Sequence, residues 1–135
     1  MADTLRLVVP GKPEYVRTVR LAVSSMAGGA GFDIEAVEDI MVAVSEACSN
    51  IVCHGAKDLD AAYEVSCEIL DDRIVINVVD QAGGYDLEQY KAPELGELNE
   101  GGLGIYIIKA LMDEVSIDSK LGSGTLIQMV KYNKG

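Results

Sequence analysis

Apolar and polar positions alternate along the chain with two different periods, and the change of period divides the sequence into elements. A two-residue period is typical of strands, and apolar residues that recur every three or four positions are typical of helices. The pattern predicts strands over residues 5–9, 63–70, 73–79, 114–119 and 125–132. It predicts helices over 14–26 and 33–55, and a third that follows the glycine-rich run at 101–104 and ends near Met112. The order of elements is therefore βααββαββ.

Turn residues mark the borders of these elements. Pro13 suits the start of the first helix, the glycine-rich segment 28–31 ends it, and Asp33 suits the cap of the second. Tight turns at residues 71–72 and 120–124 join the later strands into two hairpins. We expect the three helices to pack on one face of a mixed, mainly antiparallel sheet, which makes an α/β two-layer sandwich. The first helix is expected to bury Val16, Val19, Leu21 and Val23.

Composition and charge narrow the class of protein. A chain of 135 residues, 49% of them hydrophobic, predicts a single globular domain over residues 1–135. The formal net charge of −11 gives no footprint for direct nucleic-acid or membrane binding and favours a basic protein partner. Neither a signal peptide nor a membrane span is visible, so we expect a cytoplasmic protein. Cys48, Cys53 and Cys67 have no CxxC spacing, and we interpret them as packing residues.

The second predicted helix carries polar residues at four-residue intervals, namely Glu46, Asn50 and His54. These lie on the side away from the apolar face and are typical of the solvated face of an amphipathic helix. Ala36, Ala43 and Ala47 on the same side argue against that interpretation, because small residues allow close approach. The periodicity alone leaves both interpretations open.

Two further candidate sites are an acidic residue at the end of a predicted strand and a pair of glycines at the start of the third predicted helix. Asp80 ends an apolar strand and is followed by Gly83 and Gly84, a pattern that fits either a local turn or an acid beside closely approachable backbone. Gly102 and Gly104 stand at the start of the third helix, where bare N–H groups and the helix dipole favour an anion such as phosphate. A glycine run of this kind is also typical of a flexible joint.

In this order the three features resemble the GHKL ATP-binding superfamily of gyrase, heat-shock chaperones, mismatch-repair ATPases and histidine kinases. Within it, the chain is most similar to the anti-sigma-factor serine kinases of bacterial sporulation and stress response. The match runs from residues 44–47 with Asn50 and His54, through Asp80 and Gly84, to residues 102–104 and on to Thr125. It covers nearly the whole chain after residue 5 and implies the Bergerat-type ATPase fold.

The resemblance implies an ATP-dependent protein serine/threonine kinase. Glu46 would orient or deprotonate the attacking hydroxyl, and Asn50 would give an oxygen ligand to Mg²⁺. Asp80 would accept a hydrogen bond from the exocyclic amine of adenine. Residues 81–101 would form the ATP lid and its flanks. The implied nucleotide-binding residues are Asn50, Asp80, Gly84, Gly102, Leu103, Gly104 and Thr125.

The implied partners are a sigma factor, an anti-sigma-factor antagonist that receives the phosphate, and a second copy of the chain. The homodimer would use the first strand and first helix, with Arg17 and Arg20 as candidate contacts. Two alternatives are a non-catalytic ATP-sensing module that binds a partner and an ATPase fragment of a larger sensor kinase. The second is disfavoured, because no helix with a phospho-acceptor histidine precedes the domain.

The chain also departs from the family pattern. Ala82 stands where the family usually has glycine, and the lid carries Glu88, Glu94, Glu97 and Glu100 against Lys91 alone, so we expect modest nucleotide affinity. We assign His54 no chemistry. A zinc site from Cys48, Cys53 and His54 is disfavoured, because the two cysteines point to opposite sides of one helix.

Overall fold

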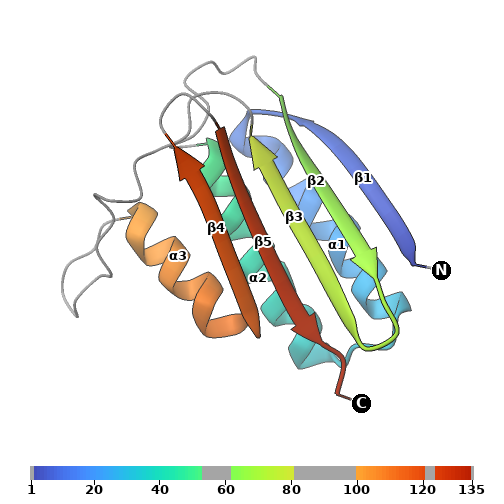
Figure 1. The fold of residues 1–135 in the computed structure, drawn as a ribbon. Coiled ribbons are helices and arrows are strands. Elements are labelled where there is room, and N and C mark those ends of the chain that lie inside the picture. The colour runs from blue at the N-terminus through green and yellow to red at the C-terminus, as the bar shows by residue number, and fades with distance from the viewer. Residues whose placement is uncertain (1, 53–61, 81–99, 121–123, 135) are drawn as a thin grey trace.

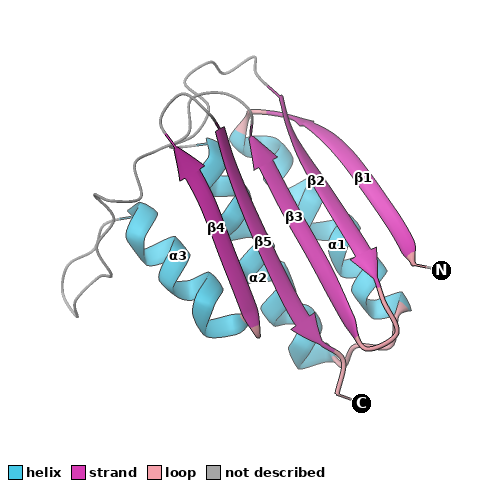
Figure 2. Cartoon of the chain, in the orientation of Figure 1, coloured by secondary structure: helices cyan, strands magenta, loops and turns pink. Residues whose placement is uncertain are grey.

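A computed structural model describes residues 2–52, 62–80, 100–120 and 124–134. Within these residues, three helices lie together on one face of a five-stranded sheet (Figures 1 and 2). The two-layer α/β sandwich and the predicted order of elements are confirmed. The strands are β1 Asp3–Pro10, β2 Ala62–Ile69, β3 Arg73–Asp80, β4 Glu114–Lys120 and β5 Gly124–Tyr132. The helices are α1 Val16–Gly29, α2 Ile34–Asn50 and α3 Glu100–Leu111.

The strand order in the sheet is β1-β2-β3-β5-β4, and neighbouring strands in this order are antiparallel. The Leu70 amide donates to the Arg73 carbonyl at 2.9 Å and closes the predicted turn of the β2–β3 hairpin. Because β5 lies between β3 and β4, the central strand β3 is flanked by β2 and β5. The end of β3 is thereby paired with the start of β5.

The core between sheet and helices is built from alternate strand residues. Successive side chains of a strand point to opposite faces, so every second residue of β3 faces the helices. Ile74, Ile76 and Val78 follow this rule and are fully buried. Asp80 continues the same alternation and is therefore directed to the helix side of the sheet, where it is also buried.

The first helix differs from its prediction in extent and in one buried residue. A 3-10 turn at Pro13–Tyr15 precedes α1, and the helix continues through Gly28 and Gly29 to end before Gly31, whose φ is +93°. Leu21 is 52% exposed, so its predicted burial is wrong. Because Val19, Val23 and Ala27 form the buried stripe at four-residue spacing, Leu21 lies about 200° around the helix from Val19.

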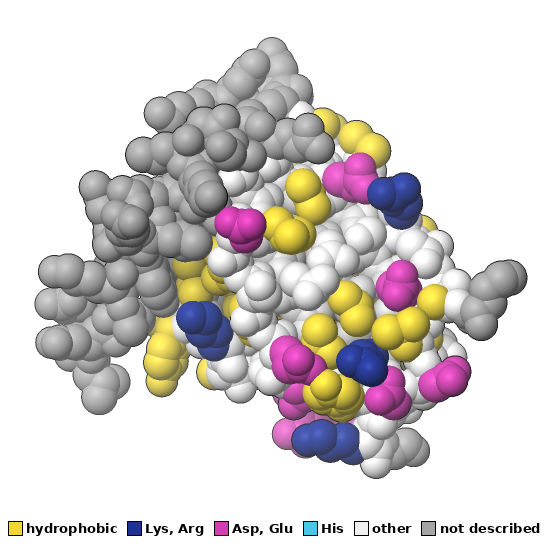
Figure 3. Space-filling view, in the orientation of Figure 1, with side chains coloured by type: hydrophobic (Ala, Val, Ile, Leu, Met, Phe, Trp, Pro, Cys, Tyr) yellow, Lys and Arg dark blue, Asp and Glu magenta, His cyan; other side chains and the backbone are white. Residues whose placement is uncertain are grey.

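The opposite face of the sheet carries no helix in the part of the chain that the structure describes, and Figure 3 looks onto it. Charged and apolar side chains are interspersed there. A polar row crosses its middle, in which Gln128 Nε2 donates to Asn77 Oδ1 at 2.9 Å and Asn77 Nδ2 donates to Ser66 Oγ at 3.5 Å. Arg6 and Glu64 form an ion pair at 3.1 Å toward the β1 edge. None of the helices in the described ranges is long and apolar enough to cross a membrane.

Candidate nucleotide and phosphate-transfer site

The central helix α2 presents Glu46 and Asn50 on one side, one helical turn apart. Asn50 is the last residue of α2 and only 5% exposed, and Glu46 is half-buried. Ala43 and Ala47, which the sequence places near this side, are fully buried. α2 packs against both α1 and α3, and this side of the helix is buried at Asn50 and partly open at Glu46. The interpretation of this stripe as a simple solvated face therefore does not hold at Asn50.

The second group lies across the ends of β3 and β5. Asp80 and Thr125 are direct cross-strand partners, and they are 1% and 3% exposed. Gly124, just before Thr125, has a φ of +90°, a conformation that glycine adopts without strain. An ionised carboxylate only accepts hydrogen bonds, so Asp80 is suited to a ligand that presents an N–H group. Gly84, predicted to lie beside it, is outside the described residues.

The third group is the start of α3. The helix begins at Glu100, so Gly102, Leu103 and Gly104 lie inside its first turns, whereas the sequence predicts them just before the helix. The first N–H groups of a helix have no partner within it, and the helix dipole favours anions there. Leu103 is half-buried and Gly104 is buried. A Cβ atom at Gly104 would lie 2.9 Å from Glu46 Oε2, so this segment of α3 lies directly against Glu46 of α2.

These groups come together at one end of the molecule. The C-terminal ends of α2 and β3 and the start of β5 lie at the upper end in Figure 1, with the start of α3 beside them. Sequence spacing does not predict the contact between Glu46 and Gly104, because the two residues are far apart in the chain. His54 and most of the predicted lid, residues 81–99, lie outside the described residues.

The cysteines that the structure describes behave as packing residues. Cys48 and Cys67 are free thiols in the core between α2 and β2. Burial raises the pKa of the Cys48 thiol to about 12. Because the thiolate is the nucleophile and metal ligand, a thiol in this state is inert at neutral pH. No metal-binding group of three His, Cys, Asp or Glu side chains occurs in the described ranges.

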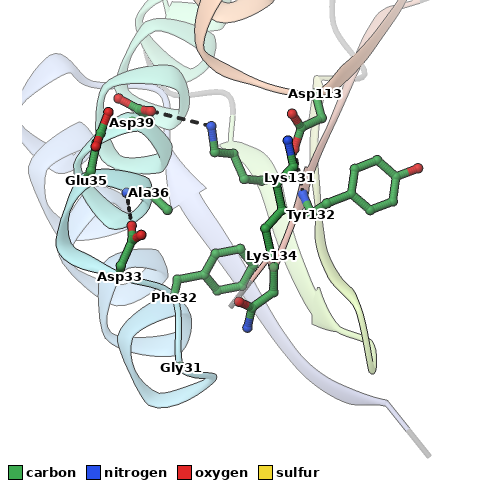
Figure 4. A pocket seen from close by; sticks show the side chains of 11 residues that line it. Gly31, Phe32, Asp33, Glu35, Ala36, Asp39, Asp113, Lys131, Tyr132 and Lys134 are labelled. Atoms are coloured by element: carbon green, nitrogen blue, oxygen red, sulfur yellow. Dashed lines mark hydrogen bonds and ion pairs between the residues drawn. The ribbon is translucent and has the colours of Figure 1, made fainter.

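A pocket of about 350 Å³ lies at the opposite end, around the start of α2 and the end of β5 (Figure 4). It contains none of the predicted site residues. Its polar groups hold the surrounding elements together: Asp33 caps α2 by accepting from Ala36 N at 2.8 Å, and Lys131 Nζ lies 2.6 Å from the Leu111 carbonyl and 3.4 Å from Asp39 Oδ2. Asp113 accepts from Tyr132 N at 2.7 Å. We interpret this pocket as a structural junction.

The model of the histidine kinase-like ATPase domain family matches residues 9–131, which include every predicted site residue. This match and the two-layer fold assign the chain to the class of histidine kinase-like ATPase domains. The chain is also 39% identical over 145 residues to the serine-protein kinase RsbW of Bacillus subtilis (strain 168), a match that covers 99% of this chain and 88% of that protein. The chain belongs to the histidine kinase-like ATPase family, with RsbW serine-protein kinases as relatives, and the predicted family is confirmed.

Solved structures show the same fold. The RsbU and RsbW domains of Rv1364c from Mycobacterium tuberculosis superpose with a TM-score of 0.73 at 22% identity, over 98% of this chain and 33% of that one. The SiaB–SiaC complex from Pseudomonas aeruginosa gives a TM-score of 0.70 at 16% identity, over 93% of this chain and 88% of that one. At these identities the likeness supports the arrangement of helices and sheet alone.

Proposed function

We propose that the chain is an anti-sigma-factor serine/threonine kinase. It binds a sigma factor and uses Mg-ATP to phosphorylate a serine or threonine of an anti-sigma-factor antagonist. The observation that carries this proposal is the position of Glu46, one turn before the buried Asn50 and against the glycine-rich start of α3. Relatives named serine-protein kinase favour it over a non-catalytic ATP-sensing module.

The described residues fit the nucleotide and its metal. Asp80 and Thr125 form a buried polar pair that suits the adenine edge, and the first turn of α3 suits the phosphates. Mg²⁺ prefers oxygen ligands and usually keeps water and phosphate oxygens, so the Asn50 amide oxygen is a sufficient protein contribution. When bound, the ion would neutralise phosphate charge during transfer.

Glu46 supplies the chemistry that this chain adds to the bound nucleotide. The substrate hydroxyl oxygen forms a bond to the γ-phosphorus while the bond from that phosphorus to the bridging oxygen of ADP breaks. The hydroxyl proton passes to the Glu46 carboxylate, which is half-buried and within reach of the α3 start. ADP leaves with the bridging oxygen, and the antagonist keeps the phosphoryl group.

A homodimer through β1 and α1 is part of the proposal. β1 is an edge strand, and edge strands pair readily with other chains. Val8 on β1 is 76% exposed, and Leu21 on α1 is exposed as well. We expect a sedimentation mass near twice the 14.4 kDa of the chain, and Leu21→Glu should lower it. A monomeric mass for the wild type at micromolar concentration would contradict the dimer.

The function is tested with the wild-type chain, labelled ATP and Mg²⁺. Small antagonist domains and sigma factors from neighbouring reading frames are the candidate partners, and the proposal places all of them in the cytoplasm. We expect one antagonist domain to gain phosphate on a serine or threonine and one sigma factor to co-purify with the chain. Sigma-factor binding without phosphate transfer to any antagonist would favour the non-catalytic module.

A further inference from the structure

Gly104 of α3 faces the side chain of Glu46 on α2 so closely that any larger residue at position 104 would force the glutamate carboxylate to move. A Cβ atom built at Gly104 would lie 2.9 Å from Glu46 Oε2, and 4.0 Å from both Cβ and Cδ of the same glutamate. Gly104 is itself buried. The carboxylate of Glu46 therefore occupies the space that a side chain at position 104 would need.

The position of Gly104 within α3 argues against a direct part for its own N–H group in phosphate binding. Gly104 is the fifth residue of α3, and only the first four N–H groups of a helix lack partners within it. Residues before Gly104 are thus better placed to offer amides to an anion. Glycine is also among the least favourable residues in a helix interior. Its presence at position 104 is explained if the surroundings leave no space for a side chain.

We infer that Gly104 is a positioning residue for Glu46. Its missing side chain lets the carboxylate lie against the first turns of α3, at the border of the proposed phosphate site. This inference rests on the proposed kinase function, because it explains how the base is held where the substrate hydroxyl arrives. The glycines of α1 provide the contrast, since a Cβ at Gly28 or Gly29 would meet nothing within 4 Å.

Gly104→Ala is the variant that tests the inference. Only the flexible end of Glu46 has to move, so the fold should persist, and the melting temperature should equal or exceed that of the wild type. A displacement of a catalytic group by ~1 Å can cost ~10²-fold in rate, so we expect kcat for phosphate transfer to fall by roughly tenfold or more. The Kd for Mg-ATP should stay within about twofold of wild type, as expected when the nucleotide contacts persist.

Gly28→Ala is the matched control, because it makes the same substitution in a helix where the added methyl group meets open space. It should leave kcat unchanged. In the Glu46→Gln background, Gly104→Ala should cause no additional loss of kcat, because the carboxylate it displaces is already absent. The inference would be overturned if Gly104→Ala lowered kcat equally in the wild-type and Glu46→Gln backgrounds, or if weaker ATP binding accounted for the loss. Either result would indicate that Gly104 acts through nucleotide binding.

A second measurement does not depend on kinase activity. The carboxyl carbon resonance of Glu46 in ¹³C NMR should shift in Gly104→Ala and stay in place in Gly28→Ala. If the wild type phosphorylates no antagonist, the proposed kinase function fails, and this resonance still decides whether Gly104 positions the Glu46 carboxylate. An unchanged Glu46 resonance in Gly104→Ala would overturn the inference.

Discussion

Glu46→Gln is expected to lower phosphate transfer to the antagonist by about two orders of magnitude or more, while Mg-ATP binding stays near that of the wild type. Glutamine keeps the shape of the side chain and one hydrogen-bond acceptor but cannot take up the hydroxyl proton. General-base catalysis typically contributes ~10²–10⁴ in rate, and that contribution is what the substitution removes. Binding and chemistry should therefore separate in this variant.

Single-turnover transfer from labelled ATP and calorimetry with Mg-ATP measure the two effects independently. Glu38→Gln is a matched control, because Glu38 is an exposed glutamate two turns earlier on the same helix. It should leave both quantities unchanged. Transfer by Glu46→Gln at the wild-type rate would remove Glu46 from the mechanism, even if the chain is a kinase.

Much of the fold could be predicted because apolar runs and the turn residues between them mark strands and helices locally. Ile74, Ile76 and Val78 are fully buried and alternate with half-buried residues, two of which, Val75 and Val79, are also apolar. The apolar run therefore predicted a strand, but it left open whether Asp80 at its end faces the helices or makes a local turn. The hairpin turns were equally local, since their residues and their closing hydrogen bond lie within a few positions.

The sequence did not predict which helix residues are buried by contact with a neighbouring helix. Asn50, Ala43 and Ala47 are buried in a helix that packs against both α1 and α3, and no helical period reports how many neighbours a helix has. The error at Leu21 has a different cause. Leu21 was expected in the core because it is apolar. The buried side of α1 is defined by Val19 and Val23, and Leu21 lies on the other side of the helix.

The candidate site was predicted residue by residue only through the family resemblance. Glu46 and Asn50 share a helix, so their spacing carries real geometric information, and Asp80 and Thr125 meet because β3 pairs with β5. The contact of Glu46 with Gly104 joins two residues more than fifty positions apart in the chain, and nothing local encodes it. The roles assigned to these residues, and to Gly84 and the lid, stay predictions.

Asp80→Asn is expected to weaken ATP and ADP binding by more than tenfold. Asp80 is 1% exposed, and a hydrogen bond from the adenine amine to this buried carboxylate should contribute ~1.5–3 kcal/mol, as is typical for a charged acceptor. Asparagine has nearly the same shape and keeps one acceptor oxygen, but it loses the charge that strengthens the hydrogen bond. The loss corresponds to roughly a 10- to 150-fold increase in Kd.

Calorimetry with ATP and ADP, each with Mg²⁺, measures this change, and thermal unfolding without nucleotide shows whether the variant is folded. Asp118→Asn on β4 is the matched control, because Asp118 is exposed and should bind nucleotide as the wild type does. The loss should be similar for ATP and ADP, since both carry the same adenine. Equal affinity of wild type and Asp80→Asn would show that Asp80 does not bind adenine. A loss of affinity for ATP but not for ADP would indicate that Asp80 acts on the γ-phosphate instead.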